Sequence, residues 1–222
     1  MIKDFIHEAL ESHNFTEIQS KENITFFKKE NNDYQRYVII FEATSLENAP
    51  TINNLIIENT PKDFINSPSF NKNTDLIITL SLPSLSDFKI NESKILEIEE
   101  NVYQFKKYIL YYSEGESELL NGKKFKDLQN ILSNHNAFKE YKNSPLNPSL
   151  YSLAARIFIK LPFLEMPIQN EEILPIEMQI ENLVKEKELE FLYNTLNSYN
   201  NVSANENLIK ELIDEELKNF QA

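Results

Sequence analysis

The sequence predicts an α+β protein with a small N-terminal antiparallel sheet flanked by helices, followed by an all-helical C-terminal region. Two observations carry this prediction. Short β-rich runs separated by turn residues occur only in the first half of the chain, and the last third shows only helical periodicity. With 222 residues, 41% of them hydrophobic, the chain is long enough to bury a sizeable core.

The N-terminal elements follow from local patterns. Residues 3–12 place their apolar side chains on one helical face, which predicts an opening helix. Two β-rich runs, 24–29 and 34–41, flank a short polar turn, and this arrangement predicts a hairpin. Residues 75–82 alternate as a third strand, which Pro83 ends, whereas residues 48–70 allow either a helix or an irregular excursion. We therefore expect a sheet of about three antiparallel strands.

The segment 94–112, KILEIEENVYQFKKYILYY, concentrates charge and aromatic residues. Its first part, 94–99, fits a strand better than a helix. From Val102 onward, the spacing of Phe105, Ile109 and Tyr112 fits one helical face. The sequence thus predicts a change from strand to helix at residues 99–101, with Gly115 as the helix stop.

Helical periodicity dominates the rest of the chain. Helices are expected over 125–138, 150–161, 171–199 and 208–220, and NSPLNPS at 143–149 has the composition of a linker. We expect an α+β domain over 1–142 and a helical region over 149–222, packed on the first domain or on a partner.

The net charge of −13 has the wrong sign for a protein that binds nucleic acid alone. Residues 165–222 contain 13 acidic and 4 basic residues, a balance of −9. These charges fit solvated helix faces or a surface that complements a basic partner. The absence of cysteine is compatible with a reducing cytosol. Because the chain shows neither a signal-peptide pattern nor a long apolar run, a cytoplasmic location without membrane contact is expected.

No catalytic constellation stands out in the sequence. Two glycines are too few for a phosphate-binding loop, and the three histidines lack a zinc-binding spacing. Asp75, Glu97 and Glu99 come nearest to a metal-dependent nuclease pattern, but no lysine follows at the required offset. We therefore expect no enzymatic activity, no cofactor and no metal site.

The segment 99–112 is the candidate partner-binding stretch. It admits three interpretations: an aromatic stripe facing the core with its lysines in solvent, a surface that docks a partner, or a stacking platform for single-stranded nucleic acid. The candidate docking residues are Glu99, Glu100, Tyr103, Phe105, Lys106, Lys107, Tyr108, Tyr111 and Tyr112.

Three stretches, FFKKENNDYQRYVIIFE, NTDLIITLSL and ILEIEENVYQFKKYILYYSEGE, carry a family resemblance. The family pattern combines a Phe-x-Lys hairpin, a strand that opens with Thr-Asp-Leu (Thr74–Leu76), an acidic pair, Phe-Lys-Lys-Tyr (Phe105–Tyr108) and a Tyr-Tyr pair. Asn101 and Val102 stand where the pattern has an acidic residue and proline. The chain resembles the middle component of ABC-type three-component systems, the accessory subunit of Lamassu-type anti-phage defence.

The resemblance implies a non-catalytic subunit that joins an SMC-like (Rad50-like) ATPase to an effector, commonly a nuclease, and that meets DNA only through the complex. Two alternatives stay open. One is an acidic, antitoxin-like inhibitor of a basic toxin. The other is a divergent metal-dependent nuclease with Asp75, Glu97 and Glu99 as ligands.

Overall fold

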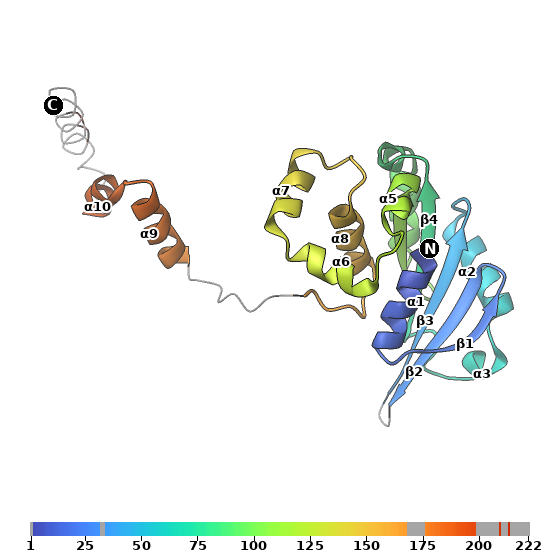
Figure 1. Ribbon diagram of the computed structural model, residues 1–222. Coiled ribbons are helices and arrows are strands. Elements are labelled where there is room, and N and C mark those ends of the chain that lie inside the picture. Colours follow the sequence, from blue (N-terminus) through green and yellow to red (C-terminus); the bar gives the residue numbers. More distant parts are fainter. Residues whose placement is uncertain (1, 32–33, 168–175, 199–208, 210–212, 214–222) are drawn as a thin grey trace. The chain divides into compact units, whose positions relative to one another are not determined.

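A five-stranded mixed sheet forms the centre of the first part of the chain (Figure 1). The computed structural model describes residues 2–31, 34–167, 176–198, 209 and 213. The strand order is β1-β2-β3-β4-β5; β1, β2 and β3 pair antiparallel, whereas β3, β4 and β5 pair parallel. The element bounds are α1 Ile2–Ser12, β1 Thr16–Lys21, β2 Ile24–Asn31, β3 Tyr34–Ala43, α2 Ala49–Asn59, α3 Lys62–Ile65, β4 Thr74–Leu82, η1 Leu85–Asp87, α4 Phe88–Glu99, β5 Lys106–Ser113, α5 Glu114–Leu119, α6 Phe125–Leu132, α7 His135–Asn143, α8 Leu150–Lys160, α9 Ile176–Glu186 and α10 Glu190–Ser198.

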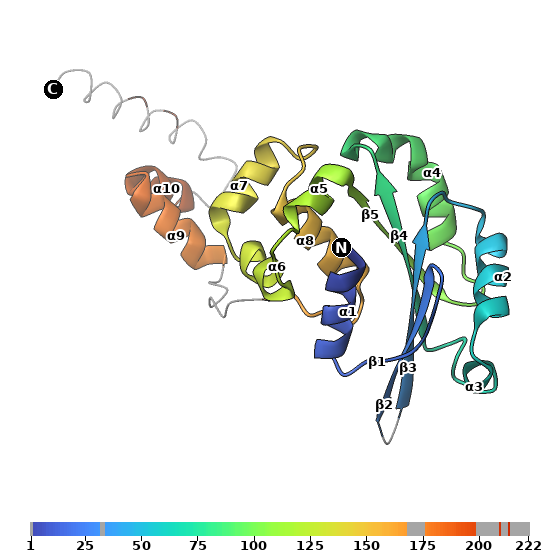
Figure 2. The same ribbon diagram turned by 45° about the vertical axis from the view of Figure 1, so that its right-hand side comes forward.

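Helices cover both faces of the sheet (Figure 2). On one face, α1, α6 and α8 pack on side chains such as Phe27 and Ile77. On the other face, α2, α3 and α4 pack on a second set that includes Phe26 and Ile78. Strands β3 and β4 are therefore buried on both sides, which explains why they are near-continuous apolar runs.

The predicted α+β class with a helical C-terminal region is confirmed, as are the opening helix, the β2–β3 hairpin and the strand ending before Pro83. The expectation of about three antiparallel strands is wrong. The connection from β3 to β4 runs through α2 and α3, and such a crossover returns the chain in the same direction, so β4 joins the sheet parallel to β3.

The expected change from strand to helix at residues 99–101 is also wrong, because the two elements occur in the opposite order. Residues 88–99 form α4, which buries Ile95 and Ile98, three residues apart, on one face. Residues 106–113 form the edge strand β5, in keeping with the strand preference of its β-branched and aromatic residues. Gly115 does not stop a helix; it lies in the first turn of α5, which Ser113 caps.

Two helices replace the one expected over 125–138, because Asn134 caps a new helix, α7, by accepting hydrogen bonds from the backbone of residues 136 and 137. The expected linker 143–149 lies between α7 and α8, and Ser149 caps α8. By its contacts the chain divides into two compact units, Met1–Gln169 and Asn170–Ala222.

The second unit contains α9 and α10 among its described residues. They fall within the helical stretch expected over 171–199, and most of the helix expected over 208–220 lies outside the described residues. None of the helices that the structure describes is both long and apolar enough to cross a membrane.

Candidate interaction surface

The connection between α4 and β5, residues 100–105, exposes apolar surface; we call it the α4–β5 loop. Val102 is 86% exposed and Tyr103 is 72% exposed, although the loop ends at buried Phe105. Gln104 adopts a positive φ of 68°, a left-handed conformation that non-glycine residues adopt infrequently. The loop thus holds a specific backbone conformation while it presents two large side chains to solvent.

Lys107 maintains that conformation from inside the protein. Its side chain is 3% exposed, and its Nζ donates to the carbonyl oxygens of Asn101 (3.2 Å), Tyr103 (2.6 Å) and Phe105 (3.0 Å), and to Asn101 Oδ1 (3.2 Å). Burial lowers the pKa of Lys107 from its ordinary value. A buried ammonium that satisfies several carbonyl oxygens fixes the loop geometry, because each acceptor would otherwise lose a partner.

Glu99, at the end of α4, joins three elements. Its Oε1 accepts a hydrogen bond from the backbone N–H of Ile109 in β5 at 2.7 Å, and Lys160 of α8 donates to both carboxylate oxygens at 2.6 and 2.8 Å. The carboxylate thereby occupies one hydrogen-bonding position on the outer edge of β5. This contact fixes the start of the α4–β5 loop relative to the sheet.

The tyrosines of β5 are half-buried. Burial is the main cause that raises the pKa of Tyr108, and the nearby Asp75 carboxylate raises it further. Burial also raises the pKa of Tyr112. Tyr111 lies under the Arg156 guanidinium, 4.8 Å from the ring centroid, and against Phe88 at 4.6 Å between rings. These rings contribute to packing and leave only part of their surface to a partner.

The nine candidate docking residues therefore separate into three groups. Phe105 and Lys107 are buried and offer no surface. Glu99, Tyr108, Tyr111 and Tyr112 are intermediate, whereas Glu100, Tyr103 and Lys106 are exposed. Sequence reasoning missed Val102, whose apolar side chain is the most exposed in the loop; its position beside a predicted docking tyrosine was the available signal.

The structure does not bring Asp75, Glu97 and Glu99 together as metal ligands. Asp75 accepts two hydrogen bonds from Arg36, Glu99 is bound by Lys160, and Glu97 is exposed on α4. Within the described ranges, no three His, Asp or Glu side chains form a group that could hold a metal ion.

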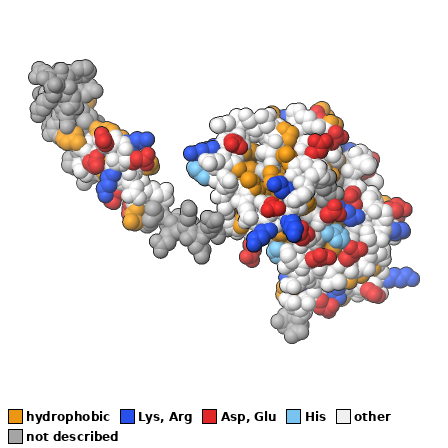
Figure 3. Space-filling view, in the orientation of Figure 1, with side chains coloured by type: hydrophobic (Ala, Val, Ile, Leu, Met, Phe, Trp, Pro, Cys, Tyr) orange, Lys and Arg blue, Asp and Glu red, His pale blue; other side chains and the backbone are white. Residues whose placement is uncertain are grey.

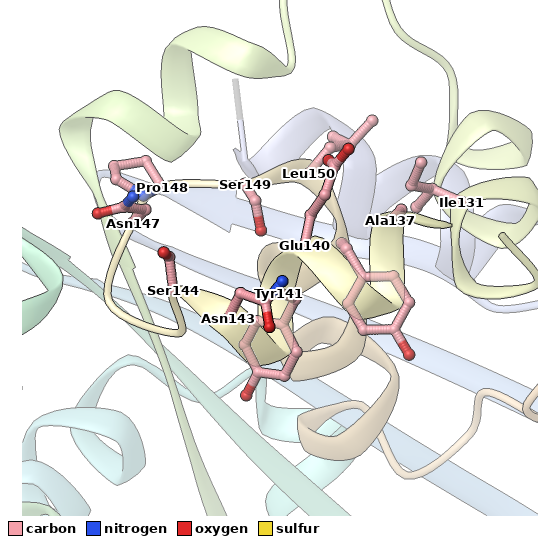
Figure 4. Close-up of a pocket in the computed structure, with 11 residues that line it drawn as sticks. Ile131, Ala137, Glu140, Tyr141, Asn143, Ser144, Asn147, Pro148, Ser149 and Leu150 are labelled. Carbon is pink, nitrogen blue, oxygen red and sulfur yellow. The ribbon is translucent and has the colours of Figure 1, made fainter. Parts of the chain in front are cut away.

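Among the described residues of the first unit, we compare two hollows that are large enough for a ligand. One, of about 520 Å³, lies beside α7 and the start of α8, and Figure 4 shows Glu140, Tyr141 and Ser144 among the residues around it. This hollow is lined by one carboxylate, that of Glu140, among neutral side chains. The other, of about 410 Å³, is lined by Tyr34, Gln35, Arg36, Lys72, Asn73, Asp75 and Lys106, and we call it the basic cleft.

Residues from three strands and one loop form the basic cleft, so no local sequence pattern predicts it. Arg36 comes from β3, Asp75 from β4 and Lys106 from β5, and Lys72 precedes β4. Only the parallel pairing of β3, β4 and β5 brings the starts of these strands to the same end of the sheet.

The model of one protein family, ABC-three component (ABC-3C) system Middle Component 1, matches residues 14–136. The match spans more than half of the chain. The chain belongs to this family. No curated protein and no solved structure matches the chain.

In this middle component, the family match begins just before β1 and ends within α7. It therefore includes all five strands, the α4–β5 loop and the residues of the basic cleft. As the middle component of a three-component system, the protein is an accessory subunit with partner subunits.

Proposed function

We propose that this middle component is a non-catalytic adaptor that links an SMC-like, Rad50-like ATPase to an effector nuclease in a Lamassu-type anti-phage defence complex. It acts in the cytoplasm and, in this proposal, the partners supply both the ATPase and the nuclease activity. An adaptor between two subunits needs two separate docking surfaces. The observation that carries the proposal is that each of the two units exposes apolar side chains in an ordered element.

In the first unit, the docking surface is the α4–β5 loop. Because Lys107 and Glu99 already hold the backbone in place, a partner that binds Val102 and Tyr103 avoids most of the entropic cost of ordering a loop. Tyrosine is enriched at the centres of protein interfaces, where its ring buries a large area.

In the second unit, the docking surface is one face of α9. Ile176, Ile180 and Leu183 follow a spacing that places them on one side of the helix, and all three are exposed. Figure 3 shows apolar side chains among charges on this unit. An amphipathic helix gains most of its stability by burying such a face, so a partner helix is the natural occupant.

The test is co-purification of the tagged protein expressed with its neighbouring genes, with mass spectrometry of the recovered subunits. We expect a large ATPase with long coiled coils and a second, effector subunit. The double variant Val102→Asp with Tyr103→Asp should lose one partner, and Ile180→Asp with Leu183→Asp should lose the other. Ile65→Asp, an exposed apolar position on α3, is the control and should retain both.

Other outcomes would overturn the proposal. Full recovery of both partners by both double variants would exclude these surfaces as docking sites. Recovery of a single small basic partner would favour the inhibitor interpretation. Binding heat with Mg²⁺ or Mn²⁺ in isothermal titration, together with DNA cleavage by the isolated chain, would favour the nuclease interpretation.

A further inference from the structure

The basic cleft concentrates positive charge in a protein whose net charge is −13. Three basic residues, Arg36, Lys72 and Lys106, line it together with one acidic residue, Asp75. Figure 3 shows acidic and basic side chains interspersed over the visible face of the first unit, the distribution of an ordinary solvated surface. A cleft with a local excess of positive charge departs from that pattern and indicates an anionic ligand.

Asp75 holds Arg36 in position. The Nε and Nη2 atoms of Arg36 donate to the same oxygen, Oδ2 of Asp75, at 3.1 and 2.8 Å. Asp75 is buried, so this ion pair fixes the guanidinium rather than leaving it to swing in solvent. An arginine positioned in this way meets an anion with little further loss of side-chain entropy.

The two lysines of the cleft are available to a ligand. Lys72 and Lys106 are both exposed, and the ammonium group of neither forms a hydrogen bond or ion pair with the residues that the structure describes. In contrast to Lys107, their ammonium groups satisfy no carbonyl oxygen. Their charges are therefore free to neutralise a ligand.

Across the sheet, Lys29 and Lys106 lie on either side of the Arg36–Asp75 pair. Lys29 of β2 lies directly opposite Arg36 of β3, and Asp75 of β4 lies directly opposite Lys106 of β5, so the members of each pair share a face. At a strand spacing of about 4.8 Å, the distance from β2 to β5 is about 14 Å. This distance exceeds the size of one phosphate group, so the surface can contact more than one phosphate. Tyr34, two residues before Arg36 on the same strand, adds an aromatic ring that is 47% exposed.

We propose that the basic cleft binds single-stranded nucleic acid. Arg36, Lys72 and Lys106 contact backbone phosphates, and the Tyr34 ring stacks on a base. A charged groove that follows the backbone, combined with an aromatic platform, is the usual basis of sequence-tolerant single-strand binding. The inference goes beyond the adaptor role, which reaches DNA only through partner subunits, and it does not depend on that role.

The experiment is fluorescence anisotropy of a short labelled single-stranded oligonucleotide titrated with the full chain, beginning at about 50 mM salt. The double variant Lys72→Glu with Lys106→Glu should weaken binding at least tenfold and flatten the salt dependence, because two phosphate contacts are lost. Tyr34→Ala should weaken binding about tenfold through lost stacking. The neutral pair Lys72→Gln with Lys106→Gln should give an intermediate loss.

The matched control is Lys94→Glu with Lys123→Glu, which changes the net charge equally at exposed positions outside the cleft. It should retain nearly native affinity. Circular dichroism melting checks that every variant is folded. The proposal fails if the native chain does not bind at low salt, or if the control weakens binding as much as the cleft variant. It also fails if polyglutamate competes as well as the oligonucleotide at equal charge, because the cleft would then bind acidic peptide.

Discussion

Replacing Lys107 by methionine tests whether one buried ammonium determines the conformation of the α4–β5 loop. Methionine keeps the apolar stem and its packing but removes every hydrogen bond to Asn101, Tyr103 and Phe105. The perturbation is therefore confined to the charge and its acceptors.

Hydrogen bonds to a charged group contribute about 1.5–3 kcal/mol each. The four acceptors of Lys107 do not simply add, for two reasons. Burial of the ammonium itself costs free energy, in line with the lowered pKa of Lys107. In addition, the Tyr103 carbonyl oxygen keeps a second donor, Nδ2 of Asn53 at 3.4 Å. We expect the free energy of unfolding to fall by about 3 kcal/mol, roughly the worth of one or two such bonds.

Urea unfolding followed by circular dichroism measures this change. Lys106→Met is the matched control, since its exposed ammonium has no partner in the part of the chain that the structure describes; it should alter the free energy by less than about 0.5 kcal/mol. If Lys107→Met unfolds within about 0.5 kcal/mol of the native protein, the loop does not depend on this side chain and the reasoning is refuted.

Two further predictions concern the edge strand β5 and its contacts. Glu99→Ala should destabilise the protein by about 2 kcal/mol, because it leaves the Ile109 N–H and Lys160 without their acceptor. Glu99→Gln should destabilise the protein less. Thermal melting compares the variants, and equal melting temperatures for the native protein and Glu99→Ala would contradict the prediction. Burial raises the pKa of Tyr108 and Tyr112, so the stability from their neutral phenols is fully present below about pH 10 and is lost as the pH rises through the raised pKa. Tyr112→Phe should therefore unfold at a higher pH than the native protein, and an unchanged midpoint of alkaline unfolding would argue against this cause.

Elements with one clear periodicity were predictable from the sequence. The opening helix repeats its apolar residues every three or four positions, and β2 and β3 are β-rich runs on either side of a polar turn. The region around residue 100 was not, because Phe105, Ile109 and Tyr112 happen to follow a helical spacing, although Phe105 directly precedes the strand β5 and the other two lie in it. Phe105 and Ile109 pack in one layer of the core and Tyr112 packs against the other layer. This tertiary packing, which the local spacing does not reveal, favours a strand over a helix.

The surroundings of the individual residues in the candidate docking stretch could not be predicted from the sequence. The sequence analysis includes both Lys106 and Lys107 among the candidate docking residues, whereas the structure buries Lys107. Successive residues of a strand point to opposite faces, so Lys106 reaches the basic cleft while Lys107 turns under the α4–β5 loop. Without knowing that residues 106–113 form a strand, nothing in the sequence distinguishes the two lysines.

The two proposals can be separated by experiment, because the docking variants change Val102 and Tyr103 whereas the cleft variants change Lys72 and Lys106. Lys106 lines the basic cleft and also a smaller hollow beside the α4–β5 loop, so a partner docked on Val102 and Tyr103 would sit next to the cleft. Loss of partners in the loop variants with normal oligonucleotide binding would assign assembly to the loop alone. Loss of oligonucleotide binding in the Lys72 and Lys106 variants with normal assembly would assign nucleic-acid contact to the cleft. If both functions hold, the adaptor would bring a nucleic-acid strand directly to the surface on which its partner docks.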